Sequence, residues 1–142
     1  MFGTKIEVRY GETDKMGVVY HSRYFPWFEV AREKLLEGYS IRYADLEKDG
    51  IMLPLVDCYC KFKKGAKYGD TVVVNAVLEK LGAASCKFVY SVVREADGVL
   101  LAEGYTSHGF VDNGFVPVNI KKIYHSTIGV EVSSTEISFN IP

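Results

Sequence analysis

The spacing of hydrophobic and polar residues changes along the chain, and each spacing predicts a different element. From Thr4 to Arg9, charged and apolar side chains alternate, which is the period of a half-buried strand. From about Ser22 to Glu37, apolar residues recur at helical spacing with charged residues between them. Ser22 suits the N-cap of this helix, and Pro26 falls in the first turn, where a missing N–H costs least. The chain therefore begins with a strand that leads through a short loop into a helix.

The predicted helix is apolar over much more than one narrow stripe. Its large apolar residues are Tyr24, Phe25, Trp27, Phe28, Val30, Leu35 and Leu36. Such a pattern predicts burial on several sides, which a sheet curled around the helix would provide. Gly38 ends this helix, and Ile41 to Lys48 predicts a short second helix that stops at Asp49-Gly50.

Everything that follows is typical of strands. The four runs are Met52–Lys63, Thr71–Leu81, Ser85–Glu95 and Val99–Val111. Asp97-Gly98 predicts a hairpin between the last two, and the short turns predict antiparallel neighbours in chain order. We therefore expect an α+β domain, with a single antiparallel sheet of about five strands around one long central helix. The segment from Gly129 to Ile141 could add a strand or lie along the surface.

Composition limits the function classes. A chain of 142 residues fits one domain, and its net charge of −1 gives no bulk attraction to nucleic acid. It has no run of about 18 apolar residues and no signal-peptide core at the start, so we expect no membrane span and a cytoplasmic address. The three cysteines are expected to be reduced, because Cys58 and Cys60 have no second pair to complete a metal site.

The loop before the long helix carries the candidate chemistry. Asp14 lies two residues before Met16-Gly17, where its carboxylate would face the N–H groups and positive dipole of a helix start. An aspartate followed by a glycine is also ordinary turn chemistry. The functional interpretation gains from the reactive and aromatic residues close by, which are Tyr10, Glu12, Thr13, Tyr20 and His21.

Two motifs resemble a known family. The first comprises Tyr10, Thr13-Asp14, Gly17-Val18-Val19-Tyr20-His21, Tyr24, and Glu29 with Arg32; the second is Ala66-Lys67-Tyr68-Gly69-Asp70. In element order and in both motifs, the chain resembles the 4-hydroxybenzoyl-CoA thioesterase family and its bacterial short-chain acyl-CoA thioesterase relatives. The resemblance runs from about Thr4 to Lys122. It implies a hotdog fold over residues 1–124, with residues 125–142 as a C-terminal extension of the same domain.

The resemblance also implies an activity and an assembly. It implies an enzyme that hydrolyses a small or medium acyl-CoA to the free acid and coenzyme A, without a metal or a tightly bound cofactor. Asp14 would be the nucleophile or general base, and the backbone N–H at His21 would polarise the thioester carbonyl. Hotdog subunits of this kind join their sheets edge to edge as dimers, commonly paired into tetramers, with the site at the subunit interface.

Physical chemistry supports these roles without deciding between them. Thioester hydrolysis builds negative charge on the carbonyl oxygen, and a fixed N–H donor aimed there contributes about 3 kcal/mol. Attack on the carbonyl and activation of a water both need Asp14. The His21 imidazole could instead bind substrate or orient a water. The further substrate-binding candidates are Gly17, Val18, Tyr20, Tyr24 and Ser85, the last because the matching turn in relatives lies near the pantetheine arm.

Other interpretations remain open at this point. The protein could act on acyl carrier protein thioesters, or bind acyl thioesters without cleaving them. A hydratase is less favoured, because no separate Asp/His hydration motif is present. His108 is expected to be a hydrogen-bonded histidine of the sheet, and the lysines from Lys61 to Lys67 are expected to form a solvated face.

Overall fold

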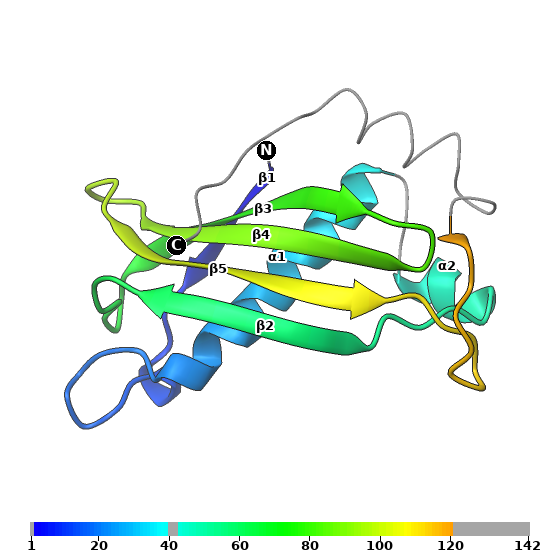
Figure 1. Cartoon of the computed structure of the whole chain (residues 1–142). Helices are drawn as coiled ribbons and strands as arrows, with labels where there is room; N and C mark the ends of the chain where they lie inside the picture. Colours follow the sequence, from blue (N-terminus) through cyan, green and yellow to red (C-terminus); the bar gives the residue numbers. More distant parts are fainter. Residues whose placement is uncertain (1, 40–42, 121–142) are drawn as a thin grey trace.

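The computed structural model describes residues 2–39 and 43–120. Within them, a five-stranded antiparallel sheet lies against one long helix (Figure 1). The elements are β1 (Phe2–Glu7), 3-10 turns η1 (Tyr10–Glu12) and η2 (His21–Arg23), α1 (Tyr24–Gly38), α2 (Tyr43–Lys48), β2 (Leu55–Phe62), β3 (Thr71–Leu81), β4 (Ser85–Arg94) and β5 (Leu100–Gly109). The predicted α+β class, with one sheet around a long helix, is confirmed. Residues 121–142 lie outside the described part, so the boundary after residue 124 stays a prediction.

The order of strands corrects one expectation. The sheet runs β1-β3-β4-β5-β2, so β3, β4 and β5 are neighbours in chain order but β2 pairs with β5 rather than with β3. The connection from β2 to β3 crosses the end of the sheet instead of making a tight turn. Lys63 N–H bonds to Leu101 O on the way, and Arg94 donates to Gly65 O and to Asp70 Oδ2. These contacts hold the connection across the ends of β5 and β4.

Helix α1 begins differently from the prediction. Its N-cap is Arg23, which makes no side-chain capping bond, because η2 runs directly into the helix. Ser22 is therefore not the N-cap, whereas Pro26 does fall in the first turn. The helix buries a wide face rather than its whole circumference, since Val30 is 40% exposed. On the buried face, the Phe28 ring stacks on Tyr90 of β4 with centroids 4.3 Å apart.

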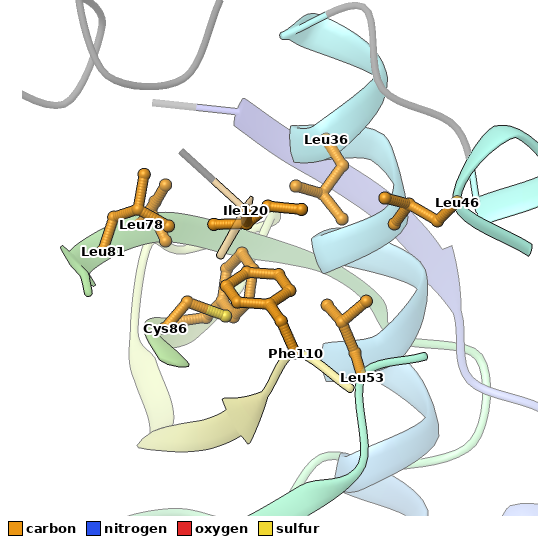
Figure 2. Close-up of a pocket in the computed structure, with 9 residues that line it drawn as sticks. Leu36, Leu46, Leu53, Leu78, Leu81, Cys86, Phe110 and Ile120 are labelled. Atoms are coloured by element: carbon orange, nitrogen blue, oxygen red, sulfur yellow. The ribbon is translucent and has the colours of Figure 1, made fainter. Parts of the chain in front are cut away.

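The core is closed at the end of α1 that lies farthest from the Asp14 loop. Figure 2 shows the apolar side chains that meet there, including Leu36 of α1, Leu46 of α2, Leu78 of β3 and Phe110, which follows β5. The cavity between them measures about 10 Å³, which is the space of one water. This end of the molecule is therefore a packed core with no room for an acyl group. No helix among residues 2–39 and 43–120 is long and apolar enough to cross a bilayer.

A buried chain of hydrogen bonds crosses the interface between α1 and the sheet. His108 Nδ1 lies 3.2 Å from Leu53 O, and its Nε2 lies 2.9 Å from Thr106 Oγ1. Thr106 Oγ1 is 2.7 Å from the Tyr90 hydroxyl, which accepts a bond from Arg32 Nη1 at 3.1 Å. A carbonyl only accepts, so a neutral His108 donates through Nδ1 and accepts through Nε2 from Thr106. All the hydrogen bonds of this series then run in the same direction, from Arg32 to the Leu53 carbonyl. The expectation of a hydrogen-bonded sheet histidine is confirmed.

This arrangement predicts that stability falls in mild acid. Burial, followed by the nearby Arg32 charge, lowers the pKa of His108 to about 4. The unfolded chain binds a proton at this residue near pH 6.5, whereas the folded chain does not until about pH 4. The contribution of the neutral His108 to the free energy of unfolding is therefore fully present above pH 6.5. It is lost as the pH falls towards 4, by about 3 kcal/mol in total. Urea unfolding at several pH values measures this loss. His108→Gln should flatten the dependence, and an unchanged slope in that variant would contradict the assignment.

Candidate active site

The Asp14 carboxylate is held by its own loop. Its Oδ1 accepts bonds from Met16 N–H at 2.8 Å and from Val18 N–H at 3.4 Å, and Asp14 N–H bonds to Val18 O at 2.8 Å. Gly17 takes the positive φ of 81° that closes this turn. Asp14 Oδ2 makes no hydrogen bond to any residue that the structure describes. One carboxylate oxygen thus fixes the orientation of the group, and the other is available for chemistry.

The two motifs that carry the resemblance lie against each other. Val19 N–H bonds to Ala66 O at 2.9 Å, and Val18 forms a bridge with Lys67. The approach is close: a Cβ at Gly65 would lie 2.5 Å from Val18 Cγ1, so this position needs glycine. The connection between β2 and β3 therefore packs against the Asp14 loop and supports it.

Together, the loop, the helix start and the end of β2 form a groove of about 350 Å³, which we call the acyl groove. It is lined by Asp14, Met16, Val18, Val19, Tyr20, His21, Tyr24, Phe62, Lys63, Lys64 and Gly65. Five of the predicted site residues, including Asp14 and His21, line this one groove. Gly17 shapes the turn beside it. Phe62 packs edge-on against Tyr24, with centroids 5.1 Å apart, and the groove thereby has an aromatic wall.

The residues at the start of the helix carry backbone donors, and His21 and Tyr24 among them line this groove. Arg23 N–H bonds to Tyr20 O, and Tyr24 N–H bonds to His21 O. The N–H groups of His21 and Ser22 donate no bond to any residue that the structure describes. The His21 ring is exposed and packs at 4.2 Å from the Tyr20 ring. The main chain of His21 therefore offers an unused donor near the positive end of the helix, whatever its side chain does.

The raised pKa values of buried thiols and of a buried phenol exclude several candidate nucleophiles. Burial raises the pKa of the Cys60 and Cys86 thiols to about 12, so neither is a thiolate at neutral pH. Burial also raises the pKa of the Tyr24 phenol, which therefore stays protonated. No group of His, Cys, Asp and Glu in the described ranges is arranged to bind a metal ion. Among the residues at the groove, Asp14 is the carboxylate with an available oxygen.

A second hollow lies on the other side of Asp14, and we call it the cationic hollow. Its volume is about 570 Å³, and its lining residues are Tyr10, Gly11, Thr13, Asp14, Lys15, Tyr20 and Arg23. Asp14 and Tyr20 line both hollows and so stand on the ridge between them. A substrate that spans this ridge would place its reacting bond at Asp14.

Ser85 is not brought to this site within one chain. It begins β4, whereas Arg94 at the other end of the same strand contacts Gly65 of the acyl groove. A strand of this length separates the two ends by roughly 30 Å. The binding role of Ser85 stays a prediction that a single subunit does not fulfil.

Sequence reasoning did not name Phe62, and it favoured a solvated face over coenzyme A phosphate binding for Lys63 and Lys64, which with Phe62 line the acyl groove. The signal was present, because these residues directly precede the Gly65-Ala66 motif. A strand end that leads into a site-supporting loop is a natural place for lining residues. It went unused because β2 was expected to lie next to β3, which would place Phe62 elsewhere.

The antiparallel sheet wrapped around α1 is a hotdog fold. The sequence matches the thioesterase-like superfamily over residues 8–137, and the chain belongs to that superfamily. This membership confirms the predicted enzyme class, a thioester hydrolase. It does not confirm the finer resemblance to the 4-hydroxybenzoyl-CoA type.

Three similar proteins illustrate the relationship. A Bacillus subtilis (strain 168) protein named "Putative acyl-CoA thioesterase YneP" is 38% identical over 121 residues, covering 84% of this chain and 87% of its own. The structure of a DHNA-CoA thioesterase from Staphylococcus aureus superposes with a TM-score of 0.85 at 33% identity, covering 96% of this chain and 95% of its own. A hypothetical protein from Thermus thermophilus gives a TM-score of 0.83 at 38% identity, with 90% and 97% covered.

Proposed function

We propose that the protein hydrolyses acyl-CoA thioesters at the acyl groove to give a free acid and coenzyme A. One observation carries this proposal: Asp14, which has an available carboxylate oxygen, and His21, which has an unused N–H, line the same groove. The thioester oxygen would accept from the His21 N–H as negative charge develops on it. Asp14 would then either attack the carbonyl carbon, giving a mixed anhydride that a water hydrolyses to the free acid and the Asp14 carboxylate, or deprotonate a water that attacks the carbonyl carbon. The C–S bond breaks, and the coenzyme A sulfur leaves as the thiol after it takes up a proton.

The two hollows suggest how the substrate lies. The acyl groove carries aromatic and aliphatic side chains, with Lys63 and Lys64 at the end of β2, and has the volume of a small or medium acyl group, aromatic rings included. The cationic hollow carries Lys15 and Arg23, which suit the anionic coenzyme A moiety. The Staphylococcus aureus relative is named for an aromatic acyl-CoA, which agrees with this placement.

Phe62→Ala is expected to raise KM for acyl-CoA by about tenfold, because the acyl group loses the aromatic wall of the groove. The kcat value should change little, since Phe62 meets His21 ring to ring, with centroids 6.4 Å apart, and the proposed oxyanion donor is the main-chain N–H of His21. Steady-state kinetics with one acyl-CoA measure both constants. Lys61→Ala is the matched control: the neighbouring side chain of β2 is exposed and lies on the opposite face of the sheet. An unchanged KM in Phe62→Ala would remove this groove as the acyl site.

The test of the proposed function is an assay of purified protein against a panel of acyl-CoA thioesters, with release of free thiol as the readout. Acyl carrier protein thioesters with the same acyl groups form the comparison arm. Activity on carrier-protein thioesters alone would change the substrate class. Saturable binding of acyl-CoA without thiol release would instead indicate a binding protein.

We also propose that the protein works as a homo-oligomer, a dimer or a tetramer of hotdog subunits. Strand β2 is an edge of the sheet and exposes apolar side chains there, with Leu55 55% and Val56 71% exposed. Unpaired edges of this kind favour pairing with another chain. Light scattering coupled to size-exclusion chromatography tests this, and a monomer would contradict it. The cytoplasmic address stays a prediction from the sequence.

A further inference from the structure

Glu12 is a buried carboxylate next to the site that the reaction does not use directly. It is 6% exposed and lines neither the acyl groove nor the cationic hollow. Its Oε1 accepts from Arg9 N–H at 2.9 Å, and its Oε2 accepts from Trp27 Nε1–H at 3.0 Å. Arg9 Nε lies 3.5 Å from Oε1. Burying a carboxylate is costly unless both oxygens are bonded, and here both are.

The bonds of Glu12 join three segments that build the site. Its side chain reaches Trp27 on α1, the helix whose start presents the oxyanion donors. Its main-chain carbonyl accepts from Tyr20 N–H at 2.8 Å, and Tyr20 directly precedes His21. Asp14 follows Glu12 by two residues on the same loop. The loop that carries the carboxylate and the helix that carries the donors are therefore tied together through Glu12.

We propose that Glu12 is a positioning residue, which sets the distance between the Asp14 carboxylate and the His21 N–H through its bond to Trp27. This inference rests on the proposed function. A reacting pair of this kind is sensitive to displacement, because a misplacement of about 1 Å can reduce the rate about a hundredfold. Releasing the Glu12–Trp27 bond lets the loop move relative to α1 without removing any group that touches the substrate.

Two variants disturb the Glu12–Trp27 pair from opposite sides. Glu12→Gln keeps the size of the side chain, but its amide has one acceptor oxygen for the two N–H donors that Glu12 now serves. Trp27→Phe keeps an aromatic ring in the core and removes the indole N–H, leaving Glu12 Oε2 without its donor. The matched control is Glu79→Gln, a half-buried carboxylate on β3 whose partner is Lys87.

Trp27 also provides a direct readout, since it is the single tryptophan of the chain. Its fluorescence emission reports whether the indole N–H is bonded, independently of any turnover. We expect Glu12→Gln to shift this emission and to lower kcat by about ten- to a hundredfold, with KM within about threefold of the parent. Trp27→Phe should give a similar loss of kcat, and Glu79→Gln should change neither emission nor kcat. Each rate is normalised to the folded fraction measured by circular dichroism at the assay temperature.

Several outcomes would overturn the inference. If kcat per folded molecule stays within twofold of the parent in both variants, Glu12 does not position the site. If the loss of activity only follows the folded fraction, Glu12 is a structural residue. Should Glu12→Gln fail to fold, Trp27→Phe decides between these outcomes. Asp14→Asn, assayed in parallel, separates this inference from the proposed function. If Asp14→Asn loses activity while Glu12→Gln and Trp27→Phe keep it, the positioning role of Glu12 is refuted and the proposed function stands.

Discussion

Asp14→Asn is expected to lower kcat for acyl-CoA hydrolysis by about three orders of magnitude, because both possible routes need the carboxylate charge. The asparagine side-chain oxygen can still accept the bonds from Met16 and Val18 that now hold Oδ1. The loop and the acyl groove should therefore keep their shape, and KM should change little. Continuous detection of released thiol, with a single acyl-CoA, measures both constants.

The control for this substitution is Asp57→Asn, which removes an exposed carboxylate from β2 outside the groove. It should leave kcat unchanged. If Asp14→Asn retains more than about a third of the parent kcat, the carboxylate is neither nucleophile nor general base, and the hydrolytic site lies elsewhere. A circular dichroism spectrum that matches the parent shows that the loss is chemical rather than structural.

The sequence predicted local structure well because local structure depends on nearby residues. The run from Thr71 to Leu81 is rich in β-branched residues between two turn segments, and β3 has these bounds. The hairpin at Asp97-Gly98 also formed, with Gly98 at a positive φ of 72°. Each depends on spacing and turn chemistry that a short stretch of chain contains.

The place of β2 in the sheet was wrong for the opposite reason. Strand pairing is decided by distant partners, and the connection from β2 to β3 looked like a turn on its length alone. Its residues instead bond to Leu101, Arg94 and Val19, three positions far apart in the sequence. Phe62 joined the site through this crossing, so the aromatic wall could not be predicted without it.

The predicted site residues that are close in sequence also lie close together in the structure, while their roles stay predictions. Asp14, Val18, Tyr20, His21 and Tyr24 lie within one strand-loop-helix segment, and the fold brings them to one groove. What the sequence could not indicate is how that segment is braced. Glu12 appeared only as a polar neighbour of Asp14, because its bond to the Trp27 indole depends on the angle at which α1 leaves the loop. The N-cap was also misplaced, since a 3-10 turn ahead of a helix has no strong sequence signal.

Gly104→Ala is expected to destabilise the protein by at least about 3 kcal/mol and to detach the edge strand that carries Phe62. Gly104 lies in β5 between Cys60 of β2 and Tyr90 of β4. A Cβ at this position would overlap the backbone oxygen of Tyr59, and a backbone oxygen within a sheet cannot turn aside as a side chain can. Strand β2 must move away from β5, and because it is the edge strand, no other strand of the same chain among the described residues holds it from the other side.

The consequence for function is specific, because the end of β2 forms one wall of the acyl groove. Gly104→Ala protein that remains folded in the cold should show a raised KM with Asp14 and its loop intact. Urea unfolding measures the stability, and kinetics at low temperature measure the KM. Gly109→Ala is the control within the same strand, since its Cβ would meet Ala84 O at an ordinary 3.8 Å. Equal stability of the two variants would show that β2 and β5 can separate by the width of a methyl group without a loss of stability. That result would contradict the close packing of the two strands at Gly104 on which this prediction rests.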